Sequence, residues 1–184
     1  MPDGPPATRG DRASDPDADP EGFARSIALR KLAASPQTRA QLDEAMRRRG
    51  VPDDVRSTVL DRFSDVGLID DAMFAKMWVE SRHAGRGLAR KALAHELRRR
   101  GVEPDVVDEA VSELPAEAEE ATARALVQRR LPATRGLDPA TRTRRLAGML
   151  ARKGYPGGLS FRVIREALES EGVPDRDLPG DPDW

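Results

Sequence analysis

The sequence predicts an all-α protein in which three tandem three-helix repeats pack into an elongated, curved array, flanked by disordered acidic termini. The first observation is composition: the helix formers Leu, Ala and Arg are abundant, and aromatic residues make up only 4% of the 184 residues, which favours helices over sheet. The second is an arginine-rich glycine motif that recurs along the chain. The third is that no segment alternates apolar and polar residues over the length of a strand.

The repeat becomes visible when Gly50, Gly101 and Gly154 are aligned. The segments EAMRRRGVPDDVR and HELRRRGVEPDVV surround the first two glycines, and the diverged ARKGYPGGL surrounds the third. Units of about 50 residues bury little surface alone, so neighbouring repeats are expected to pack on one another. Apolar residues recur eight and four positions before each glycine, and one, five and ten positions after it: Leu42, Leu93, Leu146; Met46, Leu97, Leu150; Val51, Val102, Tyr155; Val55, Val106, Leu159; Leu60, Val111, Ile164.

Composition also sets the expected boundaries. Pro, Asp and Gly crowd both ends, which contain almost no large apolar residues, so neither end can bury enough surface to offset its ordering entropy. We predict a disordered head over 1–20 and a disordered tail over 171–184. The three repeats are predicted over 21–68, 69–114 and 115–170.

The second repeat illustrates the three helices expected in each unit. Its first helix follows Asp70 as N-cap and is predicted to end at Gly85, because glycine suits a C-terminal cap. The second helix ends at Gly101 after three arginines, where the helix dipole favours cations. The third begins near Pro104. An apolar stripe on the first helix is predicted to hold Phe74, Met77 and Trp78.

The body of the chain is basic, and its two ends are acidic. Residues 22–170 contain 28 Lys and Arg against 21 Asp and Glu, whereas the whole chain has a net charge of −1. Basic helix ends can be ordinary helix punctuation or a solvated face; alternatively, a basic stripe can contact an acidic protein or nucleic acid. Similar basic faces recur in the repeats, and in the third repeat the face comprises Arg144, Arg145, Arg152 and Lys153. The candidate partner-binding residues are Arg39, Arg47, Arg48, Arg86, Arg90, Lys91, Arg98, Arg99, Arg152 and Lys153.

The sequence contains no recognisable catalytic or metal-binding arrangement of residues. The chain has no cysteine and only two histidines, His83 and His95, which form no known metal-binding spacing. Asp70 and Asp71 are read as a helix start rather than a cation site. We therefore expect a non-enzyme with no catalytic residues, metal or cofactor. With no long apolar run and no signal-peptide pattern, a cytoplasmic monomer with no membrane contact is expected.

Two segments in the middle of the chain resemble a known family. The segment RFSDVGLIDDAMFA (62–75), followed by Trp78, Arg82 and LAHELRRRG (93–101), is similar to the signature of the RecX family, bacterial regulators of the RecA recombinase. The resemblance covers about residues 22–170 and is looser in the third repeat. It implies tandem three-helix repeats that bind RecA and RecA–DNA filaments and restrain filament extension, ATP hydrolysis, strand exchange and repressor-cleavage stimulation, so modulating DNA repair and the SOS response.

Direct DNA binding by the helical repeats is the alternative. Stacked helix-turn-helix units would read bases from the start of a recognition helix. The third helices begin VPDDV, VEPDV and YPGGL, which are acidic or neutral and argue against base reading.

Overall fold

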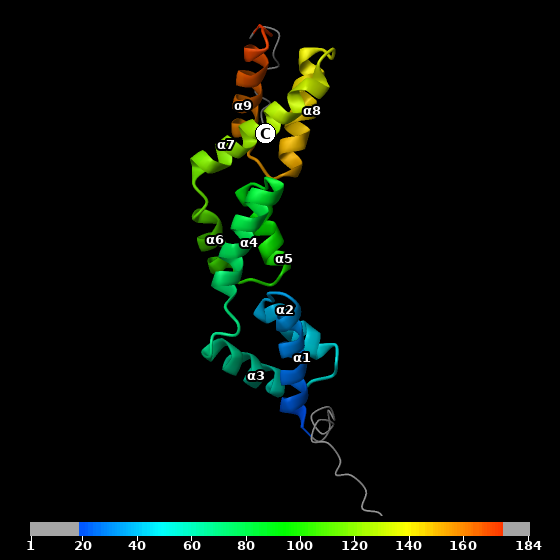
Figure 1. The fold of residues 1–184 in the computed structure, drawn as a ribbon, viewed down its shortest axis with the longest axis vertical. Coiled ribbons are helices and arrows are strands. Elements are labelled where there is room, and N and C mark those ends of the chain that lie inside the picture. The colour runs from blue at the N-terminus through cyan, green and yellow to red at the C-terminus, as the bar shows by residue number, and fades with distance from the viewer. Residues whose placement is uncertain (1–18, 175–184) are drawn as a thin grey trace, which may run out of the picture. The chain divides into compact units, whose positions relative to one another are not determined.

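A computed structural model describes residues 19–174, and within this range the chain is all-α, without strands (Figure 1). The first compact unit ends at Phe74 and includes Arg100–Val102; the second comprises Ala75–Arg99 and the chain from Glu103 onward. The helices are α1 (Pro20–Ala34), α2 (Arg39–Arg47), α3 (Asp53–Asp65), α4 (Asp71–Arg86), α5 (Arg90–Arg99), α6 (Pro104–Ser112), α7 (Ala116–Arg130), the 3₁₀ turn η2 (Leu131–Thr134), α8 (Pro139–Arg152) and α9 (Gly157–Ser170).

The first unit is built from α1, α2 and α3, which all pack against one another (Figure 1). Asp19 caps α1 by accepting a hydrogen bond from the N–H of Gly22 at 2.8 Å. Thr38 and Gln41 form a reciprocal capping box at the start of α2, which satisfies amide groups that a helix start leaves unpaired. The buried core of the unit comprises Ala24, Ile27, Ala28, Leu42, Met46, Val51, Val59, Leu60, Phe63 and Ile69.

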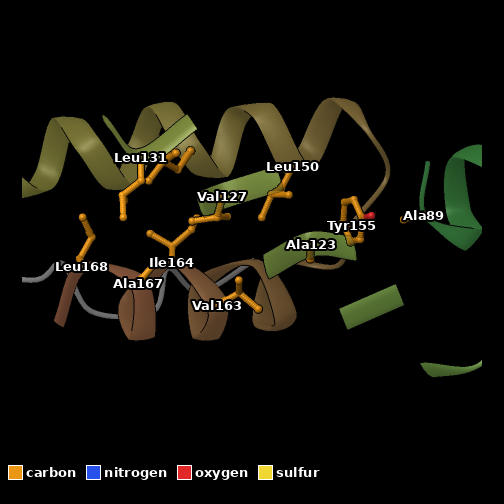
Figure 2. Close-up of a cluster of buried hydrophobic side chains, with 11 residues drawn as sticks. Ala89, Ala123, Val127, Leu131, Leu150, Tyr155, Val163, Ile164, Ala167 and Leu168 are labelled. Carbon is orange, nitrogen blue, oxygen red and sulfur yellow. The ribbon is translucent and has the colours of Figure 1, made fainter. Parts of the chain in front are cut away.

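In the second unit, α7, α8 and α9 enclose a cluster of buried side chains (Figure 2). Val127 of α7 and Ile164 of α9 lie in this cluster, as does Tyr155, which follows α8. The Tyr155 hydroxyl is buried and donates a hydrogen bond to the carbonyl of Gly87 at 3.1 Å. The cluster therefore ties α7–α9 to the turn between α4 and α5.

The periodicity of the sequence is confirmed at its central positions. Gly50, Gly101 and Gly154 have φ of 78°, 76° and 86°, which is the left-handed region expected of a glycine that ends a helix. The side chains five positions after each glycine are only half-buried. The residues eight and four positions before the glycines are fully buried: Leu42, Met46, Leu93, Leu97, Leu146 and Leu150.

The glycine ends of two middle helices rest on the start of another helix within the same unit. In the first unit, a Cβ on Gly101 would lie 2.3 Å from the Cβ of Ala40, and the Thr38 hydroxyl donates to the carbonyl of Arg100 at 2.7 Å. In the second, a Cβ on Gly154 would lie 2.6 Å from the backbone nitrogen of Ala92. By contrast, Gly50 has nothing within 4 Å of this position.

Two predictions about α4 are wrong. The helix runs through Gly85 to Arg86, and Gly87 is the glycine with positive φ, at 61°. The residue two positions later thus supplies the helix stop. Met77 is 53% exposed because the buried side of α4 carries Ala75 and Val79, one turn apart, and Met77 lies between them on the opposite side.

The fold extends slightly into both predicted disordered segments. Asp19 caps α1, and beyond α9 the Glu171 carboxylate accepts hydrogen bonds from Arg135 and from the buried Arg142. Val173 packs against the core of the second unit. The rest of the predicted head and tail lies outside the described residues.

Candidate anion-binding interface

Several predicted contact arginines are paired with acidic residues of their own unit. The Arg39 guanidinium lies 2.6 Å from the Asp61 carboxylate, and Arg98 lies 2.9 Å from Asp108. Arg47 and Arg48 share Glu44, and their hydrogen bonds lower the pKa of that carboxyl group, with Arg48 as the larger cause. These pairs are exposed, so they stabilise the fold little while reducing the local positive field.

Arg90 departs from the expectation that the basic stripe is exposed. Its side chain is 36% exposed, and its guanidinium donates to the carbonyl of Leu114, with Nε at 3.1 Å. Its backbone N–H donates to the buried Glu119 carboxylate at 2.9 Å. Arg90 therefore connects the start of α5, through hydrogen bonds, to Leu114 after α6 and to Glu119 of α7.

The remaining cations of α5 form an exposed basic face, which we define as Lys91, Arg98 and Arg99. Leu93 and Leu97, on the other side of the helix, are fully buried. Lys91 and Arg99 have no carboxylate partner within the described chain. The α5 basic face can thus offer an anionic partner two cations without a carboxylate, Lys91 and Arg99, and a third, Arg98, that is exposed but paired with Asp108.

The other predicted residues of the second unit meet at a groove of about 770 Å³. Arg86 comes from the end of α4, and Arg152 and Lys153 come from the end of α8; Arg129 of α7 joins them. The Lys153 ammonium donates to the Arg86 carbonyl at 2.6 Å. Glycine at position 87 lines the same groove, and a Cβ there would lie 3.1 Å from Leu126.

A second hollow of about 600 Å³ shares Met149 and Arg152 with the first. It adds Arg130 from α7 and Arg144 and Arg145 from α8. No acidic side chain lines either hollow. We call the two hollows together the arginine groove, defined by Arg86, Arg129, Arg130, Arg144, Arg145 and Arg152.

Arg129 and Arg130 of this groove are absent from the sequence-based interpretation, and Arg144 and Arg145 enter it only as part of the basic face of the third repeat, not as partner-binding candidates. Their signals were the runs QRR (128–130) and RTRR (142–145). Those runs do not separate exposed from buried members, because Arg142 is 6% exposed and donates to Thr134 at 3.0 Å and to Glu171.

The histidine and aspartate candidates have structural partners. His83 Nδ1 lies 2.9 Å from the Leu88 carbonyl, to which it must donate, and Nε2 lies 2.9 Å from the Thr122 hydroxyl. Asp70 caps α4 through the N–H of Met73 at 2.8 Å. Across residues 19–174, no three His, Cys, Asp or Glu residues are grouped to hold a metal ion. Nor is any helix there both long and apolar enough to cross a membrane.

Comparison with known proteins gives a consistent result along the chain. Residues 24–63, 70–111 and 117–164 match the first, second and third three-helix domains of RecX, respectively. "Regulatory protein RecX" of Thermobifida fusca is 62% identical over 150 residues, covering 82% of this chain and 81% of that protein. The protein of the same name from Streptomyces coelicolor is 58% identical over 168 residues, covering 90% and 89%.

Solved structures show the same fold at low sequence identity. RecX from Lactobacillus salivarius superposes with a TM-score of 0.77 at 17% identity, covering 83% of this chain and 99% of that one. A further regulatory protein RecX gives a TM-score of 0.74 at 19% identity, covering 90% of this chain and 83% of that one. With three domain matches in order and relatives this similar over most of their length, the chain belongs to the RecX family.

Proposed function

We propose that this chain is a non-enzymatic regulator that binds RecA and RecA–DNA filaments and restrains them, thereby modulating DNA repair. The observation that carries the proposal is the match of three RecX domains, in order, along the described body, with relatives named as regulatory proteins. Restraint would act on filament extension, ATP hydrolysis, strand exchange and repressor-cleavage stimulation. We further propose that it acts as a cytoplasmic monomer.

The α5 basic face is the surface we propose for RecA. Lys91, Arg98 and Arg99 are exposed, and each cation that meets a carboxylate gains about 1 kcal/mol at modest salt, more where the contact is partly buried. A repeat protein that touches several protomers of a filament also gains affinity through multivalency. Arg39, Arg47 and Arg48 are proposed as weaker contributors, because all three already have an acidic partner, whereas on the α5 basic face only Arg98 has one.

Base-reading DNA recognition finds less support as the main function. The first turn of α3 carries Asp53 and Asp54, and that of α6 carries Asp105. Carboxylates at these positions would repel the phosphates that flank the major groove. A sequence-independent contact with the phosphate backbone needs no such recognition helix.

The test is the ATPase activity of RecA on single-stranded DNA, titrated with the wild-type chain and with a Lys91→Ala, Arg98→Ala, Arg99→Ala variant. We expect the wild type to inhibit ATP hydrolysis, and we expect half-maximal inhibition by the variant to require a protein concentration at least about tenfold higher. A matched control replaces Arg62, Lys76 and Arg124, which have exposed acidic partners, and should inhibit like wild type. Absence of inhibition by the folded wild type would contradict the proposal, whereas equal inhibition by both variants would move the contact surface away from α5.

A further inference from the structure

The arginine groove carries more positive charge than helix punctuation explains. Arg86, Arg129, Arg130 and Arg152 lie in the last turns of α4, α7 and α8, where the helix dipole favours cations. Arg144 and Arg145, however, lie in the middle of α8, where the dipole offers no such preference. Their position therefore calls for another reason.

Neighbouring acids neutralise little of this charge. The exception is Asp138, whose carboxyl pKa is lowered chiefly by hydrogen bonds with Thr141 and to a smaller extent by the charge of Arg144. Elsewhere in the described chain, at least twelve arginines are paired with carboxylates within 4.0 Å, but none of the six groove arginines is among these pairs. Cations without a carboxylate also occur on α1 and α5, but they line neither of these two hollows. Like charges held together in a concave surface repel one another and concentrate the field, so the groove is electrostatically suited to an anion.

The lining distinguishes between two kinds of anionic partner. A protein hot spot is typically centred on a well-packed aromatic anchor, and no aromatic side chain lines either hollow. Guanidinium groups match phosphate bidentately, and Arg152 lines both hollows, so neighbouring phosphates of one polyanion can meet cations of both. The lining also lacks Asn and Gln, the side chains that read adenine.

Gly148 supports the same interpretation. It lies in the interior of α8 and lines the second hollow, although an alanine would stabilise a helix interior there by about 1 kcal/mol. A Cβ at this position would come no closer than 3.5 Å to its nearest neighbour, the Arg152 guanidinium. Steric crowding in the fold therefore does not explain the glycine, whereas its missing side chain leaves the wall of the hollow lower at this point.

We propose that the arginine groove binds the phosphate backbone of a nucleic acid strand, independently of base sequence and without RecA. The site is formed by α4, α7 and α8 and shares no residue with the α5 basic face proposed for RecA. If the groove does not bind nucleic acid, the proposed action on RecA still stands, because the two surfaces are tested by different variants and different measurements.

The experiment measures fluorescence anisotropy of a labelled single-stranded oligonucleotide, without RecA, for three forms of the full chain. The groove variant carries Arg86→Gln, Arg129→Gln, Arg145→Gln and Arg152→Gln, all exposed positions. The control carries Arg62→Gln, Lys76→Gln, Arg124→Gln and Arg162→Gln, all exposed and acid-paired. Both variants lose four positive charges, so general electrostatic attraction is matched, and circular dichroism checks that both remain folded.

We expect the groove variant to bind about a hundredfold more weakly at low salt and the control to stay within about threefold of wild type. Because the groove variant can no longer neutralise four phosphates, its slope of log affinity against log salt should be shallower by about 3. Oligonucleotides of different base composition should bind wild type equally. Equal losses of affinity in the two variants, no DNA binding by wild type, or displacement of DNA by polyglutamate at equal charge concentration would each overturn the assignment.

Discussion

Gly101→Ala should destabilise the protein much more than Gly50→Ala, although both glycines end the middle helix of a repeat. Both have φ near +75°, at 76° and 78°, so both substitutions incur the cost of a Cβ in the left-handed region, about 1 kcal/mol. They differ in their surroundings. The new Cβ at Gly101 would lie 2.3 Å from the Cβ of Ala40, whereas at Gly50 it would meet nothing within 4 Å.

The difference in free energy of unfolding follows from this overlap. Forcing one extra methyl group into a closely packed contact typically costs 1–3 kcal/mol, so about 2 kcal/mol is expected beyond the shared strain. Gly50→Ala should therefore cost about 1 kcal/mol and Gly101→Ala about 3 kcal/mol. With a urea m-value of about 2 kcal/mol/M, the two midpoints should differ by about 1 M.

A double-mutant cycle isolates the overlap. Ala40→Gly removes the methyl group that the new Cβ at Gly101 would strike and costs about 1 kcal/mol or less itself, since the site is in the first turn of α2. In the Ala40→Gly background, Gly101→Ala should cost only about as much as Gly50→Ala does. The assay is urea unfolding followed by far-UV circular dichroism. Equal midpoints for Gly50→Ala and Gly101→Ala, or no rescue by Ala40→Gly, would refute the close contact between these helix ends.

Three further predictions concern single groups. Burial raises the pKa of Tyr155, the only tyrosine, to about 12, so its ultraviolet titration should lie near that pH when folded and near 10 in urea; the stability linked to this group is present below pH 10 and lost as pH rises towards 12. Arg90→Ala should lower the urea midpoint because the half-buried carbonyl of Leu114 loses its hydrogen bond, whereas Lys91→Ala should leave the midpoint unchanged. Equal midpoints for the two variants would refute the structural role of Arg90. The pKa of Glu171 is lowered by hydrogen bonds from Arg142, the larger cause, and from Arg135. The stability that this carboxylate contributes is therefore present above its unfolded pKa, near 4.5, and is lost as pH falls through the lower folded pKa. Glu171→Gln should accordingly destabilise at pH 7 and lose this effect in acid; a pH-independent penalty would contradict the pairing.

The helical repeat could be predicted because each of its signals is local. Leu42 and Met46, like their counterparts in later repeats, are fully buried at the spacing that places them on one helix face. Glycine at positions 50, 101 and 154 marks the helix ends, since left-handed geometry strongly favours this residue. Local periodicity was less decisive in α4, where two glycines, Gly85 and Gly87, compete as the stop and only the second has positive φ.

The candidate interface was harder to predict because exposure depends on tertiary partners. Arg90 and Lys91 are adjacent in sequence, yet one is fastened to Leu114 and the other is exposed. Arg142 and Arg144 lie two positions apart, yet one is buried against Glu171 and the other lines a hollow. Charge spacing along a helix gives the face a residue occupies, but not whether a distant carboxylate or carbonyl lies there to meet it.

The central claim, that this chain restrains RecA on DNA, is tested most directly by co-sedimentation with RecA filaments preassembled on single-stranded DNA. The wild-type chain should pellet with the filaments and slow their ATP hydrolysis over the same concentration range. The arginine-groove variant should still pellet with filaments, while the Lys91→Ala, Arg98→Ala, Arg99→Ala variant should do so about tenfold more weakly or worse. A wild-type chain that sediments equally with DNA alone and with filaments, and leaves ATP hydrolysis unchanged, would contradict the account.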